Sequence, residues 1–208
     1  LKLNRFHWHL TDSPGWRLEI KRFPELTKVG AVGDYTDPKH PARFYTQDDV
    51  REILAYARVR HILVVPEIEM PAHSDAAMRA FPNLSCTGKA EYMYCPGNDA
   101  AIHFLEQVLD EVCALFDSPF IHVGGDECPR DVWAKCPKCQ ARKAANGLKD
   151  DGELQSWMTR HFDQYLARKN RRLIGWDEIL EGGLAPGATV MSWRGVKGGQ
   201  DAAALEHD

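Results

Sequence analysis

The chain has 208 residues, of which 44% are hydrophobic and 27% charged, with a formal net charge of −4. This length suffices for one domain with a substantial core, and the weak negative charge argues against nucleic acid or an anionic membrane as a partner. No apolar run approaches the roughly 18 residues of a membrane span. The opening residues, LKLNRFHWHL, lack a signal-peptide pattern and resemble a strand entered within a domain. We therefore expect the chain to be a segment of a longer one.

Strand and helix patterns then alternate along the chain. Strands are predicted at 3–10, 61–70, 119–125, 171–176 and 188–193, and helices at 48–60, 99–116 and 151–168, with a further helix beginning at about 198. Thr46 and Asp49 have the spacing of a capping box in front of the first helix. Such alternation favours a parallel sheet with helices outside it.

Polar residues and tryptophans gather where these strands end, at His9, Asp12, 67–73, 126–127, Trp176 and Trp193. A (β/α)8 barrel places its active site at this end of its strands. A doubly wound sheet also binds ligands there, but it usually carries a phosphate-binding glycine loop after its first strand, and none is visible. We predict one α/β domain over residues 1–208: a TIM barrel of which about five strands are present.

The six cysteines leave several interpretations open. The spacing of Cys136 and Cys139 is that of half a zinc site, but no second pair with matching spacing follows. A disulfide between Cys86 and Cys95 is a comparable expectation. Cys113 lies in a helical pattern and is expected to be a free thiol that fills space.

The stretch FIHVGGDECP places Asp126 beside Glu127 directly after a buried strand. Adjacent carboxylates are poorly spaced for the usual glycosidase pair, which stands about 5 Å or more apart on opposite sides of the bond. They suit a division of labour in which one protonates a leaving group and the other holds another part of the substrate. The alternative is a solvated pair at the start of the next helix, where acidic residues are favoured.

Four motifs occur in order: HWHLTD with GWR, PEIEMPAH, HVGGDE, and LIGWDE with VMSWRG. Tryptophans at two strand ends beside carboxylates suit a pyranose ring, whose C–H face packs on aromatic side chains. Taken together, these motifs resemble the glycoside hydrolase family 20 β-N-acetylhexosaminidases, from the second barrel strand through the sixth. This family is a substrate-assisted exception to the two-carboxylate scheme.

The resemblance implies catalytic roles for two residues. Glu127 matches the general acid and Asp126 matches the residue that orients the 2-acetamido group, whose oxygen is the nucleophile. Asp12 and His73 match a supporting pair near the acid. The resemblance also implies N-acetylhexosamine-containing glycans as substrates, with no cofactor and no metal.

The same resemblance implies the sugar pocket. Trp176 and Trp193 match walls of the acetamido pocket, and His122 is counted with the substrate-binding residues, although its motif position, like that of Glu67, indicates a structural role.

The chain departs from the family pattern at Glu69, where Asp is usual, and at Ala72, where Gly is usual. The sugar-binding residues that the family takes from strands 1, 7 and 8 are not found, so we expect the rest of a parent chain to complete the barrel.

Two other classes remain as alternatives. His7 and His9 lie on one strand face and could bind a catalytic metal in a barrel metallohydrolase, with His73 and His122 recruited. A carbohydrate-binding module that has lost turnover is the non-enzymatic alternative. Because bacterial relatives of this kind are often exported, a periplasmic or secreted location is expected.

Overall fold

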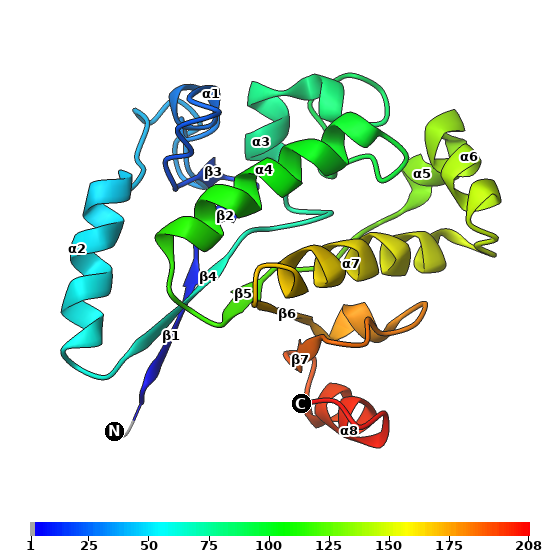
Figure 1. The fold of residues 1–208 in the computed structure, drawn as a ribbon. Helices are drawn as coiled ribbons and strands as arrows, with labels where there is room; N and C mark the ends of the chain where they lie inside the picture. The colour runs from blue at the N-terminus through cyan, green and yellow to red at the C-terminus, as the bar shows by residue number, and fades with distance from the viewer. Residues whose placement is uncertain (1–2) are drawn as a thin grey trace.

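The computed structural model describes residues 3–208, which form a parallel sheet flanked by helices (Figure 1). Its strands lie side by side in chain order: β1 (Arg5–His9), β4 (Leu63–Glu67), β5 (Phe120–His122), β6 (Arg172–Trp176) and β7 (Thr189–Met191). Every neighbouring pair is parallel, and His9 pairs with Glu67, which in turn pairs with His122. This is the order of consecutive strands in a (β/α)8 barrel, so the predicted α/β class and its five strands are confirmed.

Long helices connect the strands: α2 (Gln47–Arg58), α4 (Asp99–Leu115) and α7 (Asp151–Ala167), with α8 (Val196–Ala204) after β7. The predicted capping box of α2 is present, since Thr46 accepts a hydrogen bond from the Asp49 amide and the Asp49 carboxylate accepts one from the Thr46 amide. The side chains of Asn98 and Asp150 cap α4 and α7 by accepting a hydrogen bond from the amides of Ala100 and Glu153, respectively.

Several short elements were not predicted. They are β2 (Thr11–Asp12), β3 (Gly15–Trp16), α1 (Glu25–Lys28), α3 (Asp75–Ala80), η1 (Pro82–Leu84), α5 (Asp131–Lys135), α6 (Pro137–Ala145) and η2 (Asp177–Leu180). Most are too short to show a hydrophobic period, and tertiary contacts hold them. In α5, for example, Trp133 is completely buried and donates its indole N–H to the carbonyl of Tyr94 at 3.1 Å.

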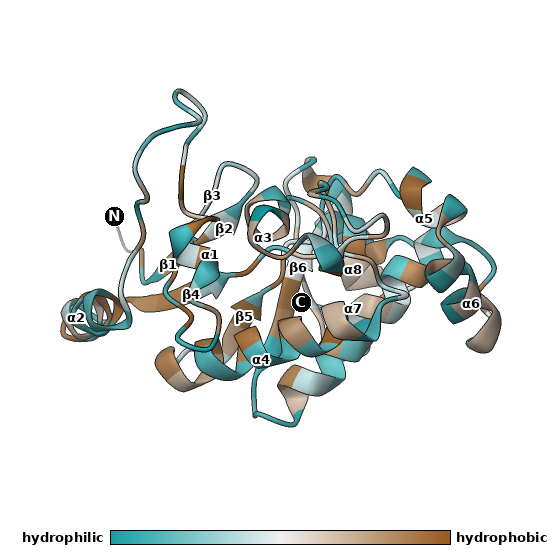
Figure 2. Ribbon diagram, turned by 90° about the horizontal axis from the view of Figure 1, so that it is seen from above, coloured by the Kyte–Doolittle hydropathy of each residue, from teal (hydrophilic) through white to brown (hydrophobic). Residues whose placement is uncertain are grey.

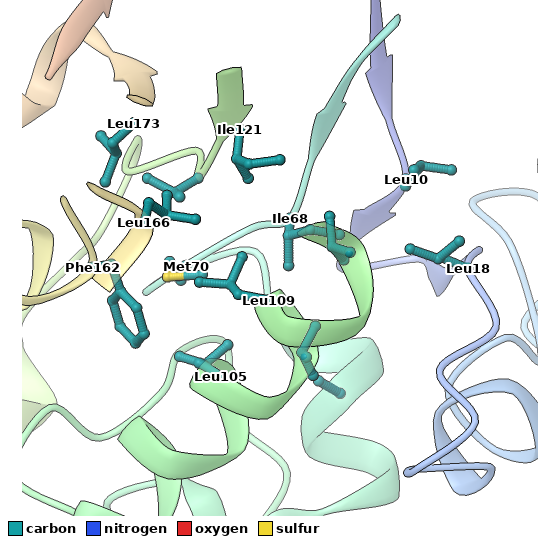
Figure 3. Packing of buried hydrophobic residues seen from close by; sticks show 14 of the residues in the cluster. Leu10, Leu18, Ile68, Met70, Leu105, Leu109, Ile121, Phe162, Leu166 and Leu173 are labelled. Carbon is teal, nitrogen blue, oxygen red and sulfur yellow. The ribbon is translucent and has the colours of Figure 1, made fainter. Parts of the chain in front are cut away.

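The main core lies between the sheet and the row of helices. Figure 2 shows hydrophobic residues of β4 and β5 beside α4. Leu105 and Leu109 of α4 are completely buried and belong to one core cluster with Ile68, Ile121 and Phe162, which Figure 3 draws as sticks. Truncating such a leucine to alanine typically costs about 2–5 kcal/mol, so this layer fixes the strands whose ends carry the site.

Within residues 3–208, no helix combines the length and the apolar composition needed to cross a bilayer.

Candidate active site

Asp126 and Glu127 follow β5 through a turn that breaks strand geometry. Gly124 and Gly125 have φ angles of +69° and +99°, and Glu127 has a φ of +47°. A Cβ on Gly124 would lie 1.8 Å from Oε2 of Glu69, so both the backbone angle and the space require glycine. Neighbours in a regular strand point to opposite faces. Because the turn removes this alternation, the two adjacent carboxylates can reach one partner.

That partner is His73. Its Nε2 lies 3.4 Å from Oδ2 of Asp126 and 3.3 Å from Oε2 of Glu127, and its Nδ1 lies 3.1 Å from Oδ1 of Asp12. The structure thus brings together all four residues predicted to be catalytic or supporting. The Asp126 side chain is 16% exposed and that of Glu127 is 55% exposed. Glu127 therefore presents the more accessible carboxyl group.

The carboxylates determine the charge of His73. Partial burial alone would lower its pKa, but hydrogen bonds to Asp12 and Asp126 raise the pKa of His73 to about 10. The imidazole is therefore a cation at neutral pH. Burial likewise would raise the pKa of Asp12, yet its hydrogen bond with His73 lowers that pKa below its ordinary value. The ion pair between Asp12 and His73 is stable across the neutral range.

Two tyrosines that the sequence motifs do not indicate complete this cluster. The Tyr92 hydroxyl lies 2.8 Å from Nε2 and 3.0 Å from Nδ1 of His73, and Tyr35 donates to Oδ2 of Asp12 at 3.2 Å. Burial and the charge of Glu127 raise the pKa of Tyr92, so it stays protonated. Both tyrosines lie in loops without a hydrophobic period, and only proximity in space identifies them.

Arg17, from the GWR motif, holds the loop that carries Tyr35. Its guanidinium donates to the carbonyls of Ala31 and Gly33 at 2.6 Å each and to that of Arg43 at 3.0 Å. One planar guanidinium has enough donors to bind all three. Its role in this structure is to organise the loop between residues 31 and 43.

Glu67 lies further back along the strands and is completely buried between two imidazoles. Its carboxyl group is 2.7 Å from Nε2 of His7 and 3.0 Å from Nδ1 of His122. Burial alone would raise the pKa of Glu67, but His122 and His7 hold it well below its usual range. His122 is also fully buried, with its ring 4.7 Å from that of Trp176. This placement favours the structural role of His122, and its substrate-binding role stays a prediction.

The two departures from the family pattern are accommodated. Glu69 is 2% exposed, and burial together with the charges of Glu67 and Asp126 raises its pKa well above the ordinary value. His73 has a φ of +51°, whereas Ala72 lies outside the left-handed region. Alanine in place of glycine at position 72 therefore introduces no backbone strain.

Trp176 is the last residue of β6, and Trp193 follows the end of β7. The Trp176 ring lies 5.5 Å from that of His7. Trp193 is 49% exposed, and its indole N–H donates to Oε2 of Glu178 at 3.0 Å. Arg194 pairs with the buried Asp177 at 3.1 Å, which holds the WRG turn in place. The sugar-binding roles of Trp176 and Trp193 stay predictions.

Histidine–carboxylate groups at these strand ends have spacings that a metal ion could use. They are His7 with Glu67 and His122, His9 with Glu67 and Glu69, and His73 with Asp126 and Glu127. His7 and His9 both lie near Glu67, at 2.7 and 3.7 Å, and His122 joins His7 there, whereas His73 lies in a separate group with Asp126 and Glu127. Local geometry alone does not separate the metallohydrolase alternative from the glycosidase.

Comparison with known proteins identifies the family. Residues 1–208 match the family model described as glycosyl hydrolase family 20, catalytic domain. The chain belongs to glycosyl hydrolase family 20. It is 50% identical to a beta-hexosaminidase of Porphyromonas gingivalis, over 100% of this chain and 28% of that protein. A beta-hexosaminidase of Vibrio furnissii is 41% identical over 92% of this chain and 35% of that protein.

Solved structures agree with this family 20 assignment. The crystal structure of beta-N-acetylhexosaminidase from Bacteroides fragilis has a TM-score of 0.90 and 41% identity, covering 98% of this chain and 43% of that one. A family 20 exo beta-N-acetylglucosaminidase from Vibrio harveyi, solved in complex with N-acetylglucosamine, has a TM-score of 0.89 and 34% identity, covering 100% of this chain and 36% of that one. The family 20 chain thus spans about a third of the curated relatives' length.

Proposed function

We propose that the protein is a β-N-acetylhexosaminidase that removes terminal, non-reducing β-linked N-acetylhexosamine with retention of configuration. Family membership supports this, as do the names of the relatives and the N-acetylglucosamine bound to the Vibrio harveyi enzyme. The observation that carries the proposal is the convergence of Asp126 and Glu127 on His73, at 3.4 and 3.3 Å. Both carboxylates therefore lie on the same side of the turn, where one sugar can contact them.

In the first step, Glu127 gives its proton to the glycosidic oxygen while the bond from that oxygen to the anomeric carbon breaks. The carbonyl oxygen of the substrate's own 2-acetamido group forms the new bond to the anomeric carbon. The product is an oxazolinium-type intermediate. Asp126 accepts a hydrogen bond from the acetamido N–H and stabilises the positive charge that develops there.

In the second step, the Glu127 carboxylate takes a proton from water, and the water oxygen attacks the anomeric carbon. The bond to the acetamido oxygen breaks, and the amide is restored. Two displacements at one carbon give net retention. The His73 cation, held by Asp12 and Tyr92, positions both carboxylates throughout.

Substitution of each carboxylate in the intact protein tests these roles. Glu127→Gln should lower kcat on an aryl β-N-acetylglucosaminide by about 100-fold or more, since general acid catalysis contributes 10²–10⁴. Asp126→Asn should also lower kcat, and exposed Glu52→Gln on α2 is the matched control that should leave it unchanged. Equal cleavage of an aryl β-glucoside, which lacks the acetamido group, would contradict the substrate-assisted mechanism. Sugar binding without turnover by the wild type would instead favour a binding module.

The proposal extends to the rest of the site and to location. Because the relatives are longer, we infer that the residues reading the remaining sugar hydroxyls lie outside these 208 residues. Export to the periplasm or the exterior is proposed from the resemblance to bacterial relatives, and cell fractionation tests it.

A further inference from the structure

Four cysteines from separate parts of the chain meet beside the active site. Cys86 and Cys95 flank the loop after η1, and Cys136 and Cys139 lie at the start of α6. The Sγ atoms of Cys139 and Cys95 are 3.5 Å apart, and those of Cys86 and Cys139, and of Cys95 and Cys136, are 3.7 Å apart. All four sulfurs lie within 4.8 Å of one another. The second pair that the sequence lacks at matching spacing is therefore supplied by a distant loop.

These distances identify the chemistry of the cluster. A zinc ion with four thiolates at about 2.3 Å in a tetrahedron separates the sulfurs by about 3.8 Å. A disulfide holds its sulfurs about 2.05 Å apart. The structure has all six cysteines as free thiols, so the predicted disulfide between Cys86 and Cys95 is wrong. We propose that Cys86, Cys95, Cys136 and Cys139 bind a structural Zn²⁺ ion as a tetrathiolate.

The surroundings fit a closed structural site. Cys95, Cys136 and Cys139 are buried in a small apolar cluster of their own, with Trp133 and Leu154. Gly97 approaches the backbone of the CxxC turn so closely that a Cβ would lie 2.2 Å from the carbonyl carbon of Lys138.

The site also has an approach from solvent. A cavity of about 330 Å³ is lined by Cys86 and Cys136, together with Thr87 and Lys135. A metal ion could enter on this side while the other two sulfurs stay buried.

The zinc ion would act on the active site through the loop it fixes. Residues between Cys86 and Cys95 include Tyr92, whose hydroxyl contacts His73. Without a cross-link, this loop and α6 are joined mainly by side-chain packing. The zinc ion would therefore hold Tyr92 in position. The ion itself would take no part in the proposed reaction.

Metal analysis of the intact protein, purified without added chelator, tests the site. The wild type should contain one more equivalent of zinc than Cys139→Ser, and Cys113→Ser is the matched control that should retain it, since Cys113 lies on α4 outside the cluster. Cys86→His should keep the metal where Cys86→Ser loses it, because histidine is also a zinc ligand. This rescue separates ligand loss from general misfolding.

Two measurements on the wild type alone make the result decisive. Replacement of zinc by cobalt should give the intense visible bands of a tetrahedral thiolate site. Thiol titration after unfolding without reductant should find all four cysteines reduced, with the zinc released as they react. Two disulfides in place of four thiols, or iron in place of zinc, would overturn the proposal. So would equal zinc content in wild type and Cys139→Ser.

Discussion

Asp12→Asn tests the electrostatic account of the site, because it removes one of the two carboxylates that raise the pKa of His73. A rise from 6.5 to about 10 corresponds to about 5 kcal/mol of preference for the protonated ring. Asp126 supplies part of this preference as well, and solvent reaches the partly exposed carboxylates. The share of Asp12 is therefore about 1 kcal/mol after discounting for solvent screening.

The sign of the pH dependence follows from the direction of the shift. Because the folded pKa of His73 lies above its unfolded value, the stabilisation is complete below pH 6.5 and is lost as the pH rises through about 10. Asp12 has a lowered pKa, so its contribution is present above its ordinary value of 3.8. The ion pair therefore stabilises the folded state most near pH 6 and does not stabilise it at about pH 11.

Thermal unfolding of the intact protein at these two pH values is the assay. Asp12→Asn should unfold about 2–4 °C below the wild type near pH 6, since 1 kcal/mol shifts the Tm of a domain of this size by that amount. The difference should vanish near pH 11. Asp201→Asn, at a half-exposed position on α8, is the charge-matched control and should match the wild type at both values. A deficit of the same size at both pH values would refute the reasoning.

Two further predictions concern the turn and the loop. Gly124→Ala should lower the free energy of unfolding by at least about 2 kcal/mol, since its Cβ would meet Glu69. Gly147→Ala, at a φ of +64° in open space, should cost only backbone strain of about 1 kcal/mol. Similar denaturant midpoints for the two variants would contradict this. Tyr92→Phe removes a hydrogen bond to the charged His73, so it should lower the Tm by about 3 °C or more, since such a bond is worth about 1.5 kcal/mol at least. It should also lower kcat, because His73 then positions the two carboxylates less well; unchanged kcat would show that the hydroxyl is dispensable for catalysis.

The sequence predicts those parts of the fold that repeat a local pattern. The apolar spacing of 99–116 and the β-branched run of 61–70 specify a helix and a buried strand wherever they lie, and both are present as α4 and β4. The short helix α5 has no such pattern. Burial of Trp133 against a distant loop holds it in place instead. Only the folded chain brings these two segments together.

The same distinction applies to the site. Asp126 and Glu127 follow β5, and His73 follows the neighbouring strand β4, so a barrel places them together once the strands are recognised. Tyr92 and the four cysteines meet through loops whose paths the local sequence does not specify. A CxxC spacing by itself shows only half of a tetrahedral site, and Cys86 and Cys95, with eight residues between them, show no metal-binding spacing.

Because Asp126 and Glu127 are consecutive, covalent bonds fix how far apart their α-carbons stand, at about 3.8 Å. In most two-carboxylate enzymes that separation depends on how distant strands pack, and a small shift of one strand changes it. Here a small movement of the strands would shift the two carboxyl groups together. A core substitution during evolution would do the same. Damage from remote mutations should therefore show as misplacement of the whole dyad relative to the sugar, with the interval between its members preserved.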